Sequence, residues 1–324
     1  MSFAKSPTMQ GALSSLAAFA IFSTHDVVVK FLGADFAPFQ IVFFSVLFGF
    51  PVVTIMLMRD RTDGNLIPRY PLWTGLRTVA QVTTSVCVFY AFSVLPMAQT
   101  YAILFATPLL ITMLAIPLLG EKVGWQRGAA VVAGLLGVMV VLRPGSTELT
   151  MGHAAALVGA CSGSFAAVIV RKVGRDERNA VLMLYPMVAN FLVMGAALPF
   201  VYVPVQVEHI GGFFMMAVLG LSATLLQILA YRTASAVIVA PMQYSQIIWA
   251  AVYGFLFFSE SLSWNTVLGA AIIIASGIFI VLREDAKPGS GAPVLSTRGR
   301  YAQGTLPRLG SIARLMKRSR VPAE

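Results

Sequence analysis

Residues 121–143 read EKVGWQRGAAVVAGLLGVMVVLR, and residues 260–283 read ESLSWNTVLGAAIIIASGIFIVLR. Each stretch opens with a glutamate, places a tryptophan four positions later and continues through apolar and small residues to Val-Leu-Arg. The second copy follows the first by about 140 residues, roughly half of the chain before its polar C-terminal tail. Self-similarity over such a distance indicates that one folding unit was duplicated.

The composition indicates a membrane protein. Hydrophobic residues make up 58% of the chain, charged residues only 11%, and the mean hydropathy is +0.82. A soluble domain carries about 25% charged residues. Here the charges fall between apolar runs of about 20 residues, the length that crosses a hydrocarbon layer as a helix. Because barrel strands would alternate apolar and polar residues, we expect an all-α polytopic membrane protein.

The apolar runs predict ten transmembrane helices in two repeats of five. They cover about residues 9–32, 38–58, 72–94, 98–119 and 125–142, and then 151–171, 180–202, 212–232, 237–258 and 264–282. Because five is an odd number, the second repeat crosses the membrane in the opposite sense to the first. Inverted repeats of this kind place a binding site near the middle of the membrane, between the two halves.

Basic residues predict the orientation and the domain limits. They cluster in every second connection, while the opposite connections hold only Arg143. Positively charged connections stay in the cytoplasm, so we expect an inner-membrane protein with both termini on the cytoplasmic side. The predicted regions are a cytoplasmic N-terminus at 1–8, the first repeat at 9–143, the second repeat at 150–283 and a basic tail at 284–324.

The net charge of +10 does not indicate nucleic-acid binding, because nine of the 23 basic residues lie from Arg283 onward and topology explains most of the others. The tail is rich in Pro, Gly, Ser and Arg, which predicts disorder. Residues 306–320 could instead fold as a basic helix on the lipid headgroups, and both interpretations stay open. Cys87 and Cys161 lie inside apolar runs and are expected to be packing residues, with neither a disulfide nor a metal site.

Ionisable groups at membrane depth are functional candidates because they are costly to bury. In the first span, Asp26 and Lys30 are four residues apart and share a helix face. Asp26 could bind substrate or couple transport to protons, or it could simply pair with Lys30. Lys30 could also extend to the headgroups. His25 is expected to point elsewhere as a packing residue.

Polar and aromatic side chains gather on the third, eighth and ninth spans, with one tyrosine on the fourth. In the third span Arg77, Gln81, Thr84 and Val88 form one stripe, in which Arg77 either acts in charge recognition or extends to the surface. We predict that the fourth, eighth and ninth spans add cavity-lining residues for hydrogen bonding and stacking: Tyr101, Gln227, Tyr231, Gln243, Tyr244 and Trp249. Hydrogen bonding between helices is the alternative for each amide.

Other signals favour structure over chemistry. Glu121 and Glu260 precede the fifth and tenth spans and are expected to cap helices structurally. A hydrolase built on Ser164 with His153 or His209 is a weak alternative, because no G-x-S-x-G motif is present. The chain has no nucleotide-binding G-x-x-x-x-G-K-[ST] loop and no potassium-channel filter sequence. We therefore expect no enzyme, no catalytic residue, no metal and no cofactor.

The ten spans, the inverted repeats and the Gly-Glu or Ser-Glu link after the fourth and ninth spans resemble the EamA-type family of the drug/metabolite transporter (DMT) superfamily. Residues 90–125, YAFSVLPMAQTYAILFATPLLITMLAIPLLGEKVGW, are especially similar to its fourth-helix region. The resemblance covers about residues 9–283. It implies a central cavity lined by the first, third, fourth, sixth, eighth and ninth helices, and solutes such as amino acids, nucleotide sugars, riboflavin, S-adenosylmethionine or drugs.

One position departs from the family pattern. Many bacterial members have P-x-Q-x-x-x-x-R early in the second helix; here Pro38 and Gln40 match, but Ser45 stands where the arginine is expected. If that arginine neutralises Asp26 or a substrate anion, Lys30 or Arg77 has to serve here, or the substrate differs.

Together these features predict a carrier that moves a small organic metabolite across the inner membrane by alternating access. The amides and aromatic residues favour a polar aromatic or heterocyclic solute, such as riboflavin or an aromatic amino acid. The alternative is a membrane scaffold or subunit that transports nothing and acts through its basic tail. A central cavity lined by the third, eighth and ninth spans would favour the carrier.

Overall fold

The computed structural model describes residues 7–58, 66–120, 124–143, 149–173, 176–234 and 239–285, which form helices and no strands. The first repeat comprises α1 (Pro7–Asp35), α2 (Pro38–Met58), α3 (Pro71–Val94), α4 (Met97–Leu104), α5 (Thr107–Leu119) and α6 (Trp125–Leu142). The second comprises α7 (Met151–Val173), α8 (Asn179–Val201), α9 (Val207–Thr233), η2 (Ala240–Ser245), α11 (Gln246–Phe258) and α12 (Trp264–Asp285). With α4 and α5 counted as one span, and η2 and α11 as another, these elements match the ten predicted spans.

Most of these helices have the hydropathy of membrane spans. By length and composition alone, five described segments qualify: Met9–Asp35, Met97–Leu119, Met151–Val173, Val181–Val201 and Val207–Gln227. Three shorter apolar helices add Pro38–Pro51, Gly128–Leu142 and Trp264–Ile280. The predicted all-α, multi-pass architecture is confirmed.

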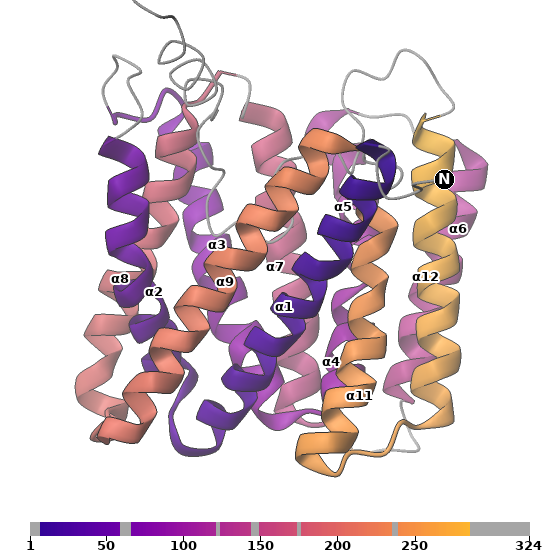
Figure 1. The fold of residues 1–324 in the computed structure, drawn as a ribbon. Helices are drawn as coiled ribbons and strands as arrows, with labels where there is room; N and C mark the ends of the chain where they lie inside the picture. The colour runs from indigo at the N-terminus through magenta and orange to yellow at the C-terminus, as the bar shows by residue number, and fades with distance from the viewer. Residues whose placement is uncertain are drawn as a thin grey trace, which may run out of the picture.

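Helices of one repeat pack against helices of the other in pairs that the repeat symmetry relates (Figure 1). α1 packs along α9, while α7, the counterpart of α1, packs along α3, the counterpart of α9. Equivalent helices also meet each other, as α2 with α8, α4 with α11 and α6 with α12. Figure 1 shows the α2–α8 pair and the α6–α12 pair at opposite ends of the bundle. A pseudo-twofold axis in the membrane plane, as expected for inverted repeats, relates the α1–α9 contact to the α7–α3 contact.

The duplicated segments of the sequence form α6 and α12, which touch through their backbones. A Cβ atom on Gly137 would stand 2.9 Å from the carbonyl oxygen of Gly269, and one on Gly269 would stand 2.6 Å from that of Gly137. Small residues let membrane helices approach this closely and gain van der Waals contact. The repeated motif therefore joins the two halves of the bundle.

The fourth span of each repeat is interrupted near a proline. α4 ends at Leu104, and α5 begins at Thr107 with Pro108 in its first turn. In the second repeat, a 3₁₀ turn, η2, contains Pro241 and precedes α11. Pro117 lies inside α5 without ending it. Irregular backbone at membrane depth is tolerated where it is buried in protein or lines a cavity, so both interruptions indicate the place of a site.

Some helix boundaries differ from the prediction by a few residues, and parts of two predicted regions lie outside the described residues. α9 begins at Val207, earlier than the predicted 212, and Glu208 in its first turn favours the positive end of the helix dipole. α12 continues to Asp285, beyond the predicted end of the apolar run. The described residues exclude 1–6 and 286–324, so the predictions for the N-terminus and for the basic tail remain predictions.

The contact between α6 and α12 is testable. A Gly137→Leu substitution should destabilise the protein by at least about 1–3 kcal/mol, because overpacking a close contact forces backbones apart. Its thermal unfolding in detergent should shift down by several degrees. Gly128→Leu on the same helix is the matched control, since a Cβ there has no neighbour within 4 Å. Equal unfolding temperatures for the two variants would contradict the proposed contact.

Candidate functional site

A cavity of about 190 Å³ lies between the two repeats. Its wall is formed by residues of α1, α3, α4, α5, α7, α9, η2 and α11. These elements are the six spans that the family resemblance implies. The third, eighth and ninth spans are among them, which is the observation that favours a carrier over a scaffold.

Small residues on α7 make room for the cavity. The α7 wall consists of residues without large side chains, apart from one valine: Gly159, Ala160, Gly163, Ala166, Ala167 and Val170. α7 also packs closely on α3, because a Cβ on Gly159 would stand 2.9 Å from Cγ2 of Val88. Larger side chains at these positions would fill the cavity or separate the two helices.

The polar stripe of α3 lines the cavity as its spacing predicts. Arg77, Gln81, Thr84 and Val88 all contribute to the wall. The Thr84 hydroxyl donates to the carbonyl of Ala80 at 2.8 Å, so its own helix satisfies it. Within the described part of the chain, the Gln81 amide makes no hydrogen bond to protein. Its donor and acceptor are free for a solute.

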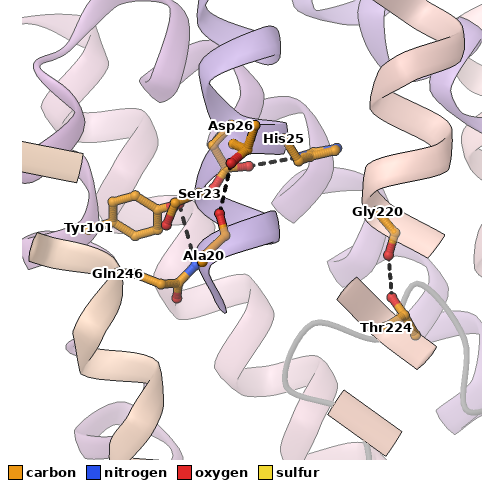
Figure 2. A network of polar contacts seen from close by, with 9 residues as sticks. Ala20, Ser23, His25, Asp26, Tyr101, Gly220, Thr224 and Gln246 are labelled. Carbon is orange, nitrogen blue, oxygen red and sulfur yellow. Dashed lines mark hydrogen bonds and ion pairs between the residues drawn. The ribbon is translucent and has the colours of Figure 1, made fainter. Parts of the chain in front are cut away.

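Asp26 is the centre of a polar network on the cavity wall (Figure 2). Its Oδ1 lies 2.8 Å from Nδ1 of His25, and its Oδ2 accepts a hydrogen bond from the Tyr101 hydroxyl. Nε2 of Gln246 donates to that hydroxyl at 3.4 Å. The network therefore joins α1 and α4 of the first repeat to α11 of the second. The prediction that His25 points elsewhere is wrong, because its ring turns back to the neighbouring carboxylate.

The interruption before α11 supplies two amides. Gln243 in η2 and Gln246 at the start of α11 both line the cavity. Gln246 is 1% exposed, and its Oε1 atom has no hydrogen-bond partner among the described residues. An unsatisfied buried acceptor costs about 1–3 kcal/mol. A donor on a bound solute would remove that cost.

Lys30 pairs with Glu260 and not with Asp26, so the alternative of an intrahelical Asp26–Lys30 pair is wrong. Its Nζ lies 2.9 Å from Oε1 of Glu260 and also donates to the carbonyls of Leu95 and Phe92. The Phe92 carbonyl is free because residue 96 is a proline without an N–H. Only 11% of the Lys30 side chain and 16% of the Glu260 side chain are exposed, so Lys30 does not extend to the headgroups.

Glu260 also caps a helix, but a different one from the helix that follows it. Its Oε2 accepts a hydrogen bond from the backbone N–H of Met97, the first residue of α4, at 2.9 Å. The first N–H groups of a helix have no partner within the helix, so the carboxylate satisfies one of them. Glu121 and its predicted cap lie outside the described residues.

Arg77 is buried beside the cavity instead of extending to the surface. It is 6% exposed, and its Nη1 donates to the backbone carbonyl of Leu182 on α8. That carbonyl is free because the residue four positions later, Pro186, has no N–H. The direction of the side chain depends on this contact between repeats, which helical spacing alone does not predict.

Three predicted cavity residues lie outside the cavity wall. Gln227 accepts a hydrogen bond from Ser15 at 3.4 Å and so joins α9 to α1. Tyr244 packs edge-to-face on Phe105, with 5.1 Å between ring centroids. Trp249 stacks on Tyr253, 6.1 Å away. The side chain of Tyr231 lies outside the described residues. Phenylalanines 22, 89 and 92 line the cavity beside Tyr101 and replace the aromatic residues predicted to stack on a solute.

The hydrolase alternative has no geometric support. The Ser164 hydroxyl donates to the carbonyls of Ala160 and Thr107, at 2.6 and 3.2 Å. His153 bonds to Gln99 at 2.9 Å, and His209 lies 3.7 Å from Asp35. Neither histidine contacts the serine. Among the described residues, no group of three or more His, Cys, Asp or Glu could hold a metal ion.

Comparisons with known proteins agree with this geometry. The sequence model of the EamA-like transporter family matches residues 9–143 and 150–282. The S-adenosylmethionine uptake transporter of Rickettsia prowazekii is 25% identical over 81% of this chain and 89% of its own length. The pseudopaline exporter of Pseudomonas aeruginosa is 26% identical over 83% and 94%. The riboflavin transporter of Rhizobium johnstonii is 27% identical over 86% and 94%.

A solved crystal structure shows the same fold. It superposes with a TM-score of 0.57 at 17% sequence identity and covers 86% of this chain and 98% of the solved one.

The Lys30–Glu260 pair predicts a measurable loss of stability. Lys30→Met should cost about 3–5 kcal/mol, because it leaves the partly buried Glu260 carboxylate without its cation. Unfolding in detergent, followed by intrinsic fluorescence, should show the shift. Asp35→Asn is the matched control on the same side of the bundle, because Asp35 is 61% exposed and its contact with His209 contributes little. Similar shifts for both variants would contradict a structural role for the buried pair.

Proposed function

Because the chain belongs to the EamA-like transporter family, it is a membrane transporter and not an enzyme, and we propose that it carries a small organic solute by alternating access. The observation that carries the proposal is the cavity between two inverted repeats, whose largely apolar wall holds a few placed polar groups. Substrate sites of inverted-repeat transporters lie at this interface, often beside interrupted helices. Rocking of one half against the other would expose the cavity to each side in turn.

In the proposed orientation, the start of α1 lies on the cytoplasmic side of the inner membrane. On that side lie Arg69, Arg171, Lys172 and Arg178, whereas Arg143 lies at the opposite end of the bundle. A positive charge bias of this kind holds connections in the cytoplasm. The Lys30–Glu260 pair would then close the outer end of the cavity in this conformation.

The proposed solute has a polar heteroaromatic part. Phe22, Phe89, Phe92 and Tyr101 offer ring faces, and three glutamines lie among them on the wall. Aromatic surfaces with a few placed amides are typical of sites for flat, polar ligands. Two of the matched relatives are named for riboflavin and S-adenosylmethionine, both of which contain such rings. An aromatic amino acid is a third solute of this chemistry.

Uptake by purified protein in liposomes tests the function directly. Radiolabelled riboflavin, S-adenosylmethionine and tryptophan would be supplied separately, with empty liposomes as the blank. We expect at least one to accumulate or exchange, and Gln81→Ala to reduce its uptake about 2- to 10-fold by removing one hydrogen-bonding group. Thr83→Ala on α3 is the control, because its hydroxyl donates to Val79 and the side chain lies off the cavity wall. Equal loss in both variants would contradict the proposed site.

Proton coupling through Asp26 is a separate proposal. Asp26 lines the cavity and contacts a histidine and a tyrosine, which are groups able to exchange protons with it. With the transported solute, Asp26→Asn should abolish the acceleration of uptake by an imposed pH gradient, while exchange without a gradient continues. An unchanged response to the gradient in Asp26→Asn would exclude this role.

A further inference from the structure

We propose that the solute carries a carboxylate and that Arg77 binds it at one end of the cavity. This inference rests on the proposed function and specifies its substrate class. Arg77 is the one lysine or arginine among the described residues that line the cavity. The guanidinium has five N–H donors in a planar fork, a geometry that matches carboxylate oxygens.

The charge of Arg77 has no protein counter-ion in the described part of the chain. Its Nη1 donates to the Leu182 carbonyl, and its Nε has no hydrogen-bond partner. The other cation near the cavity, Lys30, is already paired with Glu260. Asp26, the one carboxylate among the described residues that line the cavity, is engaged by His25 and Tyr101. A buried cation without a counter-ion is costly at membrane depth, and a bound carboxylate would supply the missing negative charge.

Arg77 and Asp26 lie at different ends of the cavity. Asp26 bonds to Tyr101, whose ring lies 5.0 Å from that of Phe92 near the end of α3. Arg77 lies 15 residues before Phe92 on the same helix, which corresponds to about 22 Å along the helix axis. A solute bound through its carboxylate at Arg77 would extend its body along α3 toward Gln81 and Phe89.

Thermal-shift measurements on purified full-length protein test the proposal with matched ligands. The panel pairs free acids with their uncharged carboxyl derivatives: tryptophan, phenylalanine, S-adenosylmethionine, indole-3-propionate and nicotinate, each beside its methyl ester or amide. Riboflavin is included as a neutral heteroaromatic solute. A ligand that binds the folded state raises the unfolding temperature. We expect only free acids to stabilise the protein, and their esters or amides to have little effect.

Variants then assign the effect to one side chain. Arg77→Gln should weaken binding of the stabilising acid about 10- to 100-fold, since it removes a charge-assisted hydrogen bond. The affinity of Arg77→Lys for the acid should lie between those of the unchanged protein and Arg77→Gln. Lysine keeps the positive charge but loses the planar, two-pronged arrangement of N–H donors. Arg69→Gln is the control for net charge, since Arg69 is exposed just before α3 and lies off the cavity wall.

Folding of the variants has an independent check. The unfolding temperature and elution volume without ligand report whether Arg77→Gln is folded. If it is not, the acid-versus-ester comparison on the unchanged protein decides the proposal alone, together with Arg77→Lys.

Several results would overturn the proposal. These are stabilisation by riboflavin or an ester as strong as by any acid, equal binding of the acid to Arg77→Gln, or a panel in which no free acid stabilises the protein more than its ester. Transport of riboflavin that is unchanged in Arg77→Gln would refute carboxylate recognition and leave the proposed carrier function intact. Absence of transport for every bound solute would instead count against the carrier function.

Discussion

A polar group inside a hydrocarbon layer has to find its partner within the protein, because no water is there to replace it. The cavity wall follows this constraint residue by residue. The hydroxyls of Thr84, Ser85 and Thr224 donate to carbonyls of their own helices. Lys30 uses the Phe92 carbonyl that Pro96 leaves free, and Arg77 uses the Leu182 carbonyl that Pro186 leaves free. Prolines and cations are thus paired across the bundle at these two positions. On the cavity wall, Arg77 and Gln246 keep buried polar atoms without a protein partner among the described residues.

Duplication and inversion explain how this arrangement is assembled. The contacts of α1 with α9 and of α7 with α3 are equivalent by the repeat symmetry. The two helix pairs form two sides of the cavity. The α6–α12 pair lies at one end of the bundle, where Gly137 and Gly269 bring the two repeats into backbone contact. The repeated Glu–Trp–Val-Leu-Arg segment is therefore scaffold. Gln81, Gln246 and Arg77, which line the cavity, do not belong to it.

The fold and one wall of the site could be predicted from the sequence, because both depend on local periodicity. Apolar runs predicted the ten spans, and spacing along α3 predicted the face that carries Arg77 and Gln81. The predictions that were wrong concern side chains whose partners lie in distant segments of the chain. The partner of Lys30 is Glu260, 230 positions away, and helical spacing suggested Asp26 instead. Tyr244 and Trp249 are oriented by Phe105 and Tyr253, and the 3₁₀ turn before α11 changes the direction that α-helical spacing would give them.

The central claim is that one cavity serves both sides of the membrane. Gln81→Cys in a background with Cys87→Ala and Cys161→Ala places one thiol on the cavity wall. A membrane-impermeant maleimide would be applied to inside-out and to right-side-out vesicles, and the fraction of labelled protein measured by mass spectrometry. Alternating access predicts labelling from both sides, at rates that a transported solute lowers. Labelling from one side only, or from neither, would contradict it.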